Sequence, residues 1–150
     1  MLRLSKKADY ALMAVRHLAL PDGPSSASAR EIAEEYGIPL ELMAKVLQRL
    51  VRAGLLSSTQ GARGGYMLSR LPAAISVSDV IQAIDGPFMV TACSTDNDDC
   101  DQYSKCSVRD PLWQIRERIV ATLDTVTIAE MAADSDAVQA PMAHAAVIKR

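Results

Sequence analysis

Apolar residues repeat at helical spacing in the first third of the chain, and polar breaks divide this pattern into three segments. The first segment follows Ser5, a predicted N-cap, and runs to Leu20, where a turn-rich stretch ends it. The second begins after Ser28, whose hydroxyl fits a capping box with Glu31, and ends at Gly37, which suits a left-handed C′ position. The pattern therefore predicts one helix followed by a shorter one.

The third segment separates polar from apolar residues most sharply. Pro39 is expected at its first helical position, and the helix is expected to reach Ala53 before Gly54 stops it. One face carries a continuous apolar stripe, formed by Leu42, Met43, Val46, Leu47, Leu50 and Val51. A short helix, a glycine turn and a longer helix with a polar outer face are typical of a helix-turn-helix.

Two short runs that suit β-strands follow the third helix. They are Leu55–Thr59 and Tyr66–Leu68, and three glycines lie in the six-residue loop between them. Three helices followed by a hairpin predict a mainly α fold, a winged helix-turn-helix with a small β-hairpin as its wing.

The second half of the chain contains two further helical patterns. Ser76 and Asp79 are expected to cap a fourth helix that ends near Ile84. Asp110 is expected to cap a long helix with Pro111 at its first position. Apolar residues then recur with gaps of 3, 4, 4 and 3, close to the repeat of a helix–helix seam, at Leu112, Ile115, Ile119, Leu123 and Val126.

These patterns divide the chain into four parts. Residues 1–87 are predicted to form the winged helix-turn-helix DNA-binding domain and 88–108 a loop that contains the cysteines. Residues 109–132 form the predicted dimerisation helix region, within which Thr127 and Glu130 fit a capping box for a short separate turn. Residues 133–150 lack an apolar stripe and are expected to be a disordered tail.

Composition and charge narrow the class of protein. Hydrophobic residues make up 49% of the 150 and aromatic residues only 4%, which favours a helical core over a strand-rich one. Residues 1–70 carry ten basic and six acidic side chains, whereas residues 71–150 carry six and twelve, which suggests two tasks. The apolar stretches are too short for a membrane span, and the start lacks a signal-peptide cleavage site. We therefore expect a cytoplasmic protein with no membrane partner.

The polar face of the third helix suits the major groove of double-stranded DNA, where base edges are distinguishable. Candidates for base contacts are Leu40, Glu41, Ala44, Lys45 and Gln48. Candidates for backbone or wing contacts are Arg49, Arg52, Gln60, Arg63, Gly64, Arg3, Lys6 and Lys7. The alternative is that these charges form an ordinary solvated face. The order of helices and the glycine-rich wing favour DNA binding.

Three cysteines, Cys93, Cys100 and Cys106, lie in a loop rich in Ser, Asn and Asp. Gaps of six and five residues match neither a C-x-x-C redox motif nor the commonest zinc modules. Three thiolates on one loop can supply soft sulfur ligands for an iron–sulfur cluster or for zinc, with a fourth ligand from elsewhere. Reactive or incidental thiols are the alternative.

The chain resembles the Rrf2 family, the IscR/NsrR-type regulators, over roughly residues 1–131. The resemblance is carried by four stretches: MLRLSKKADYA at 1–11, GIPLEL at 37–42, LQRL at 47–50 and GARGGYML at 61–68. It is strongest toward the subgroup that regulates Suf iron–sulfur assembly genes. The resemblance implies a homodimer whose long C-terminal helices cross and a [2Fe–2S] cluster in the cysteine loop of each chain.

The resemblance also assigns ligands. Cys93, Cys100 and Cys106 match the family's ligand positions, although the first gap is one residue longer than in its commonest pattern. The IscR branch completes the site with a His where this chain has Arg109. The nitric-oxide-sensing branch uses an Asp on the first helix of the partner chain, and Asp9 matches that position. The alternative role for Asp9 is a carboxylate that the helix dipole favours.

The two histidines of the chain, His17 and His144, are weaker candidates for the fourth ligand. The reading surface departs from the IscR branch at Ala44, which replaces a Glu, and at Gln60, which replaces an Arg, so we expect a different operator.

The predicted function is a DNA-binding transcriptional repressor of iron–sulfur assembly genes that senses through a bound [2Fe–2S] cluster, and not an enzyme. The alternatives are a zinc-stabilised or thiol-redox winged-helix regulator, or a protein-binding adaptor without a cluster.

Overall fold

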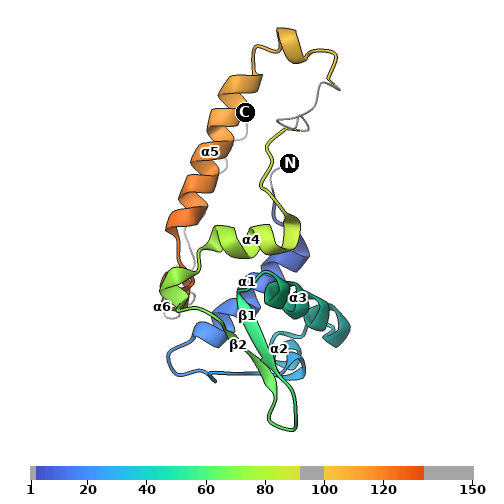
Figure 1. Cartoon of the computed structure of the whole chain (residues 1–150), viewed down its shortest axis with the longest axis vertical. Helices are drawn as coiled ribbons and strands as arrows, with labels where there is room; N and C mark the ends of the chain where they lie inside the picture. The colour runs from blue at the N-terminus through green and yellow to red at the C-terminus, as the bar shows by residue number, and fades with distance from the viewer. Residues whose placement is uncertain (1–2, 92–99, 134–150) are drawn as a thin grey trace, which may run out of the picture.

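The computed structural model describes residues 3–91 and 100–133. Cys93, His144 and nearly all of the predicted tail therefore lie outside the described residues. The helices and the hairpin of the first 85 residues form one body, and α5 (Arg109–Thr125) projects from it as an arm (Figure 1). The hairpin points away from the body at the end opposite to this arm.

The three N-terminal helices form where the sequence predicts them. Helix α1 spans Lys6–Ala19, α2 spans Ala29–Tyr36 and α3 spans Leu40–Arg52. The Ser5 hydroxyl accepts from Ala8 N at 3.1 Å, and Ser28 and Glu31 form the predicted capping box. Gly37 ends α2 with φ of 63°. Pro39 is the N-cap of α3 and not its first residue, because its carbonyl accepts the first intrahelical bond, from Met43 N at 3.0 Å.

The wing is an antiparallel hairpin of β1 (Leu56–Thr59) and β2 (Gly65–Leu68). Ala27 pairs with Tyr66 beside it, through bonds of 3.1 and 2.8 Å, and so ties the hairpin to the chain that enters α2. A Cβ on Gly65 would lie 2.9 Å from the Ala27 carbonyl, so this close pairing requires glycine.

The core lies between α1, α3, α4 (Val77–Asp85) and the base of the hairpin. Helix α1 contributes mainly small side chains, which let the neighbouring helices approach closely, while α3 and α4 supply larger ones. The fully buried large side chains include Ile32, Met43, Leu47, Leu50, Leu55, Leu56, Ile75 and Ile128. Each of them contributes about 1.5–3 kcal/mol on burial.

Helix α5 begins earlier than predicted. Its N-cap is Val108, whose carbonyl accepts from Leu112 N at 3.0 Å, so the predicted cap by Asp110 is wrong. The Asp110 carboxylate instead accepts from Arg109 Nε at 2.7 Å. Pro111 still falls in the first turn, where a missing N–H leaves no bond unmade. Helix α5 fully buries none of its residues, and Ile115 is 44% exposed.

A short sixth helix, α6 (Ile128–Ala133), follows α5 and packs on α1, with Ile128 fully buried. Thr127 and Glu130 form its predicted capping box, and Arg16 Nε donates to Met131 O at 2.8 Å. The last part of the segment 109–132 thus joins the core of the body. Short 3-10 turns, η1 (Pro72–Ala74) and η2 (Tyr103–Lys105), complete the described elements.

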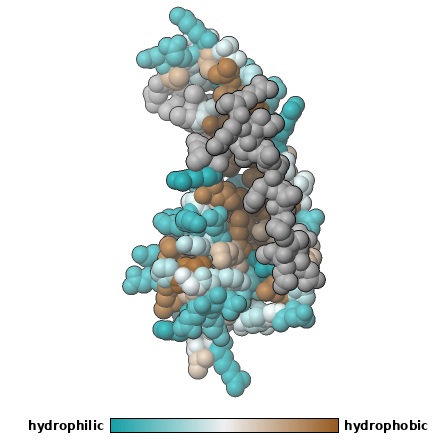
Figure 2. Space-filling model, turned by 180° about the vertical axis from the view of Figure 1, so that it is seen from behind, coloured by the Kyte–Doolittle hydropathy of each residue, from teal (hydrophilic) through white to brown (hydrophobic). Residues whose placement is uncertain are grey.

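Hydrophobic side chains reach the surface both on the body and on the projecting arm (Figure 2). Even so, no helix within the described ranges combines the length and the apolar character that crossing a membrane requires.

Candidate nucleic-acid interface and cysteine site

Helix α3 turns its apolar stripe into the core and its polar stripe to solvent. Met43, Val46, Leu47 and Leu50 are buried. On the other side the structure leaves the predicted base-contact residues accessible: Leu40, Glu41, Lys45 and Gln48 are exposed and Ala44 is half-buried. The outer face of α3 is therefore free to enter a groove of DNA.

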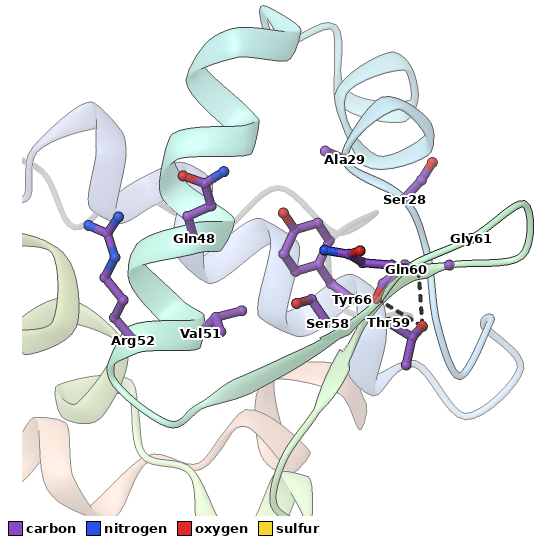
Figure 3. A pocket seen from close by; sticks show the side chains of 12 residues that line it. Ser28, Ala29, Gln48, Val51, Arg52, Ser58, Thr59, Gln60, Gly61 and Tyr66 are labelled. Atoms are coloured by element: carbon purple, nitrogen blue, oxygen red, sulfur yellow. Dashed lines mark hydrogen bonds between the residues drawn. The ribbon is translucent and has the colours of Figure 1, made fainter.

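A groove of about 530 Å³ separates α3 from the wing. Gln48, Val51 and Arg52 line one side of it (Figure 3). The other side is formed by hairpin residues, among them Ser58 and Tyr66. The two are cross-strand partners and lie on the same face of the hairpin; they are not among the residues predicted from the sequence, although the alternation of side chains along a strand is a signal for this face.

The predicted wing residues lie at or near the tip of the hairpin. Gln60 and Arg63 are exposed and Gly64 is half-buried. A Cβ on Gly64 would collide with the Thr59 carbonyl oxygen, so the loop closes this tightly only with glycine. The tip thus presents a cation on a compact turn.

Four basic residues meet at a second, smaller cavity of about 220 Å³ between α1 and α3. They are Lys7, Lys45, Arg49 and Arg52, and no acidic side chain lines the cavity. Among residues 3–91 and 100–133 none of the four forms an ion pair. We call these residues the basic cluster. No carboxylate lines this cavity or forms an ion pair with the cluster in the described residues, which suits the binding of phosphates.

Arg49 has a second role that the sequence did not indicate. Its Nη1 donates to the carbonyl oxygen of Ile84, at the end of α4, at 2.9 Å. The other N-terminal candidates lie elsewhere: Arg3 and Lys6 line a cavity with Asp9, and Lys6 Nζ lies 3.9 Å from the Asp9 carboxylate. The structure therefore brings Lys7 to the basic cluster and leaves Arg3 and Lys6 apart from it.

Cys100 and Cys106 flank the turn η2 at the far end of the arm (Figure 1). Both thiols are free and half-buried, and Tyr103 N donates to Cys100 O at 2.9 Å within the turn. Their soft sulfur donors fit the chemistry of an iron–sulfur or zinc site. The third predicted ligand, Cys93, lies outside the described residues.

Arg109, at the start of α5, contacts the turn between the two thiols. Its Nη1 donates to Tyr103 O at 3.1 Å, and its guanidinium lies 4.5 Å from the centre of the Tyr103 ring. The hydrogen bond from Arg109 lowers the pKa of the Asp110 carboxyl, so this pair stays charged at neutral pH. A charged guanidinium has no lone pair for a metal, so Arg109 supports the turn and does not supply a ligand.

Of the fourth-ligand candidates, the structure describes Asp9 and His17, and neither reaches Cys100 or Cys106 within one chain. Asp9 lies in the first turn of α1, with its side chain 44% exposed, on the body and not on the arm (Figure 1). His17 is engaged with Tyr36, the ring Nδ1 and the hydroxyl being 3.0 Å apart. In the described part of a single chain, no three or more His, Cys, Asp or Glu side chains lie close enough together to hold a metal ion. A site that joined Asp9 to Cys100 or Cys106 would take its Asp9 from a second chain.

Comparison with known proteins agrees with the winged-helix architecture. The Rrf2 family, described as iron-dependent transcriptional regulators, matches residues 4–134. The transcriptional regulator IscR of Yersinia pseudotuberculosis is 32% identical over 136 residues, which are 90% of this chain and 82% of that protein. The family is one of transcriptional regulators and not of enzymes.

Solved structures lead to the same conclusion. CymR, the global cysteine regulator of B. subtilis, matches with a TM-score of 0.70 at 29% identity, over 91% of this chain and 100% of that one. IscR of T. potens matches with a TM-score of 0.69 at 30% identity, over 94% and 93% of the two chains. The predicted winged-helix fold class is thereby confirmed.

Proposed function

The chain belongs to the Rrf2 family of transcriptional regulators, and from this premise we propose that it is a homodimeric, cytoplasmic repressor of iron–sulfur assembly genes. In this proposal its affinity for operator DNA depends on a [2Fe–2S] cluster. The observation that carries the DNA-binding part is the basic cluster beside the exposed face of α3.

The DNA-binding surface combines reading and anchoring groups. The outer face of α3 enters the major groove, where Lys45 suits guanine, Gln48 suits adenine and Glu41 suits the amino group of cytosine. Arg52 and Lys7 suit backbone phosphates, because they belong to a cluster without carboxylates. Arg63 at the tip of the wing suits the minor groove or its backbone.

Dimerisation through α5 is supported by what that helix exposes. It fully buries no side chain in the single chain, and an apolar groove runs along it, lined by Ile115, Ile119 and Leu123. A second α5 laid against this face would bury the seam at the spacing of a helix–helix contact. The net positive charge of one DNA-binding domain is modest. A dimer would bring two such domains to the DNA and so double the number of phosphate contacts.

The cluster part of the proposal rests on the donor set. Cys93, Cys100 and Cys106 would supply three thiolates and Asp9 of a second chain the fourth ligand. When bound, a [2Fe–2S] group supplies a redox-active centre whose loss is a chemical signal. Asp9 belongs to the helix that carries Lys7, so a ligand shared between chains would tie the arm of one protomer to the DNA-binding body of the other. Coupling of about 1–3 kcal/mol would change operator affinity roughly 5–150-fold.

The test is anaerobic purification followed by absorption spectroscopy, iron and sulfide analysis and DNA binding with and without the cluster. We expect a visible iron–sulfur spectrum that Cys106→Ala abolishes, and an operator affinity that differs between the two forms. Reconstituted protein that holds no iron would contradict the cluster. DNA binding that is absent under every condition would contradict the whole proposal.

A thiol-based regulator without a cluster is the second candidate. It is favoured by the two free, half-buried thiols at η2 and by the similarity to CymR, a cysteine regulator. It predicts colourless protein whose DNA affinity changes on treatment with a thiol oxidant and returns with a reductant. The cluster mechanism predicts that iron content and DNA affinity change together.

A further inference from the structure

The chain segment that ends α4 contacts α3, α5 and the N-cap of α1. Arg49 of α3 donates to Ile84 O at 2.9 Å. The Asp85 carboxylate accepts from the Ser5 hydroxyl at 2.5 Å and from Ser5 N, before α1, at 3.2 Å. We call residues 84–88 the α4 junction.

The third contact comes from the arm. Arg116 Nε of α5 donates to the carbonyl oxygen of Phe88 at 2.6 Å. Its guanidinium lies 4.6 Å from the centre of the Trp113 ring on the same helix, which holds the donor in place. The α4 junction thus contacts α3, the N-cap of α1 and the arm within five consecutive residues.

Hydrogen bonds attach α5 to the body at two separated points. At its C-terminal end, Val77 N donates to Val126 O and Ile128 N donates to Ile75 O, both at 2.9 Å. The second point is Arg116, ten residues earlier and about 15 Å along the helix. A rod held only at one end can swing, and a second anchor fixes its direction. Helix α5 also packs on α4, but it fully buries none of its residues there, so the Arg116 bond adds a directional anchor to this packing.

We propose that Arg116 is a positioning residue that sets the angle between α5 and the body, and thereby the half-site spacing that the dimer recognises in DNA. This inference rests on the proposed function, namely a dimer formed through α5 that reads DNA with α3. In such a dimer the two arms join the two bodies, so the angle of the arm contributes directly to the separation and relative rotation of the two α3 helices. Half-site spacing follows from that geometry.

The path from Arg116 to the reading surface is short. Phe88 lies three residues after Asp85 and four after Ile84, and Ile84 O holds Arg49 on α3. Hydrogen bonds from a charged guanidinium are stronger than neutral ones. Loss of the Arg116 bond would free the arm and leave the contacts of Ile84 and Asp85 in place.

The experiment measures how sharply the dimer distinguishes spacings. Duplexes selected by the wild-type dimer from a random library are lengthened or shortened by one base pair at their centre, which rotates the half-sites by roughly 35°. We expect wild-type protein to lose affinity at least about tenfold for either change, a loss comparable to that from a mismatched base pair. Arg116→Met removes the donor and should reduce this discrimination about fivefold or more, within the range of typical coupling.

Two variants serve as controls. Arg116→Lys keeps a donor and should retain more of the discrimination than Arg116→Met. Arg70→Met removes an exposed arginine beyond the open end of the hairpin and should leave the discrimination unchanged. Equal losses of affinity on every duplex, or an unchanged spacing preference in a folded, dimeric Arg116→Met, would overturn the proposal.

A measurement without DNA tests the same inference independently. A spin-labelled residue in place of Glu41, at the exposed start of α3, reports the distance between the two copies by pulsed electron paramagnetic resonance. We expect a narrow distribution in the wild type and a broader one in Arg116→Met, and equal distributions would overturn the proposal. If the wild type does not form a dimer or binds no DNA, the proposed function fails; if it does both and Arg116→Met behaves like it, only this inference fails.

Discussion

Arg109 fastens the turn between two cysteines to the start of α5, through Tyr103. Its Nη1 donates to the Tyr103 carbonyl at 3.1 Å while its guanidinium lies 4.5 Å from the centre of the aromatic ring. Tyr103 lies between Cys100 and Cys106, so this contact limits how far the two thiols can move relative to the helix. Groups that orient metal ligands typically change metal affinity by 10–100-fold when they are removed.

If the cysteines hold the proposed cluster, Arg109→Ala should lose it about tenfold faster in air than the wild type, measured by the decay of visible absorbance. Lys105→Ala is the matched control, because it removes one positive charge from the same turn without removing the contact with Tyr103. Equal decay rates for Arg109→Ala and the wild type would show that the contact does not orient the ligands.

Gly64 closes the wing where any side chain would collide with the Thr59 carbonyl. We expect Gly64→Ala to distort the tip that carries Arg63 and to weaken operator binding roughly fivefold or more, equivalent to one lost contact of about 1 kcal/mol. The measurement is a fluorescence anisotropy titration with labelled duplex. Ala62→Ser, at the exposed tip, should bind as the wild type does. Unchanged affinity in Gly64→Ala would show that the shape of the tip does not contribute.

Arg52 lies in the basic cluster, near Lys7 and Lys45. If its partner is a backbone phosphate, Arg52→Met should weaken binding to all DNA sequences alike and reduce the slope of log affinity against log salt by about 0.9 per protomer, or about 1.8 for the bound dimer. Titrations at several salt concentrations measure this slope. Arg30→Met is the control, because Arg30 pairs with Glu34 on α2 at 3.9 Å. An unchanged slope in Arg52→Met would remove Arg52 from the phosphate contacts.

Local patterns predicted the elements that local interactions determine. The stripe of α3 and the capping boxes at Ser28, Ser76 and Thr127 could be predicted because both partners of each cap lie within three residues. The predicted N-cap of α5 was wrong. Asp110 is a good capping residue, but its carboxylate accepts from the Arg109 guanidinium instead of capping the helix. Residue propensity thus indicates a candidate cap, but a competing hydrogen-bond partner determines whether its side chain caps the helix.

Contacts between distant segments could not be predicted in the same way. Arg49 and Ile84 are 35 positions apart, and Arg116 and Phe88 are 28 apart, so no periodicity links them. The docking of α6 on α1 belongs to the same class, because the burial of Ile128 depends on where α5 leads the chain. The sequence shows which side chains of the cysteine loop carry sulfur donors, whereas a ligand from a second chain, as proposed for Asp9, would depend on how two chains assemble.

Glu31 makes the start of α2 sensitive to acid. Hydrogen bonds from Ser28 lower the pKa of its carboxyl below the usual 4.5, and Ser28 N donates to it at 2.6 Å. Because the pKa is lower in the folded state, the contribution to stability is complete above about pH 4.5 and is lost as the pH falls through the folded pKa. Urea unfolding at pH 6 and pH 3 should show a smaller acid-induced loss in Glu31→Gln than in the wild type. Parallel losses in the two proteins would contradict this role.

Ile119 lies at the centre of the apolar face of α5, in the groove with Ile115 and Leu123. If two α5 helices pack through this face, Ile119→Lys would place a charge in the contact without a partner, which is strongly destabilising for a buried pair of helices. We expect this variant to be monomeric in sedimentation velocity at concentrations where the wild type is dimeric, and to bind DNA more weakly as a result. Gln114→Lys adds the same charge on the opposite side of the helix, where it is exposed, and should remain dimeric. A dimeric Ile119→Lys would place the contact between protomers on another surface, and with it the relation between the two recognition helices.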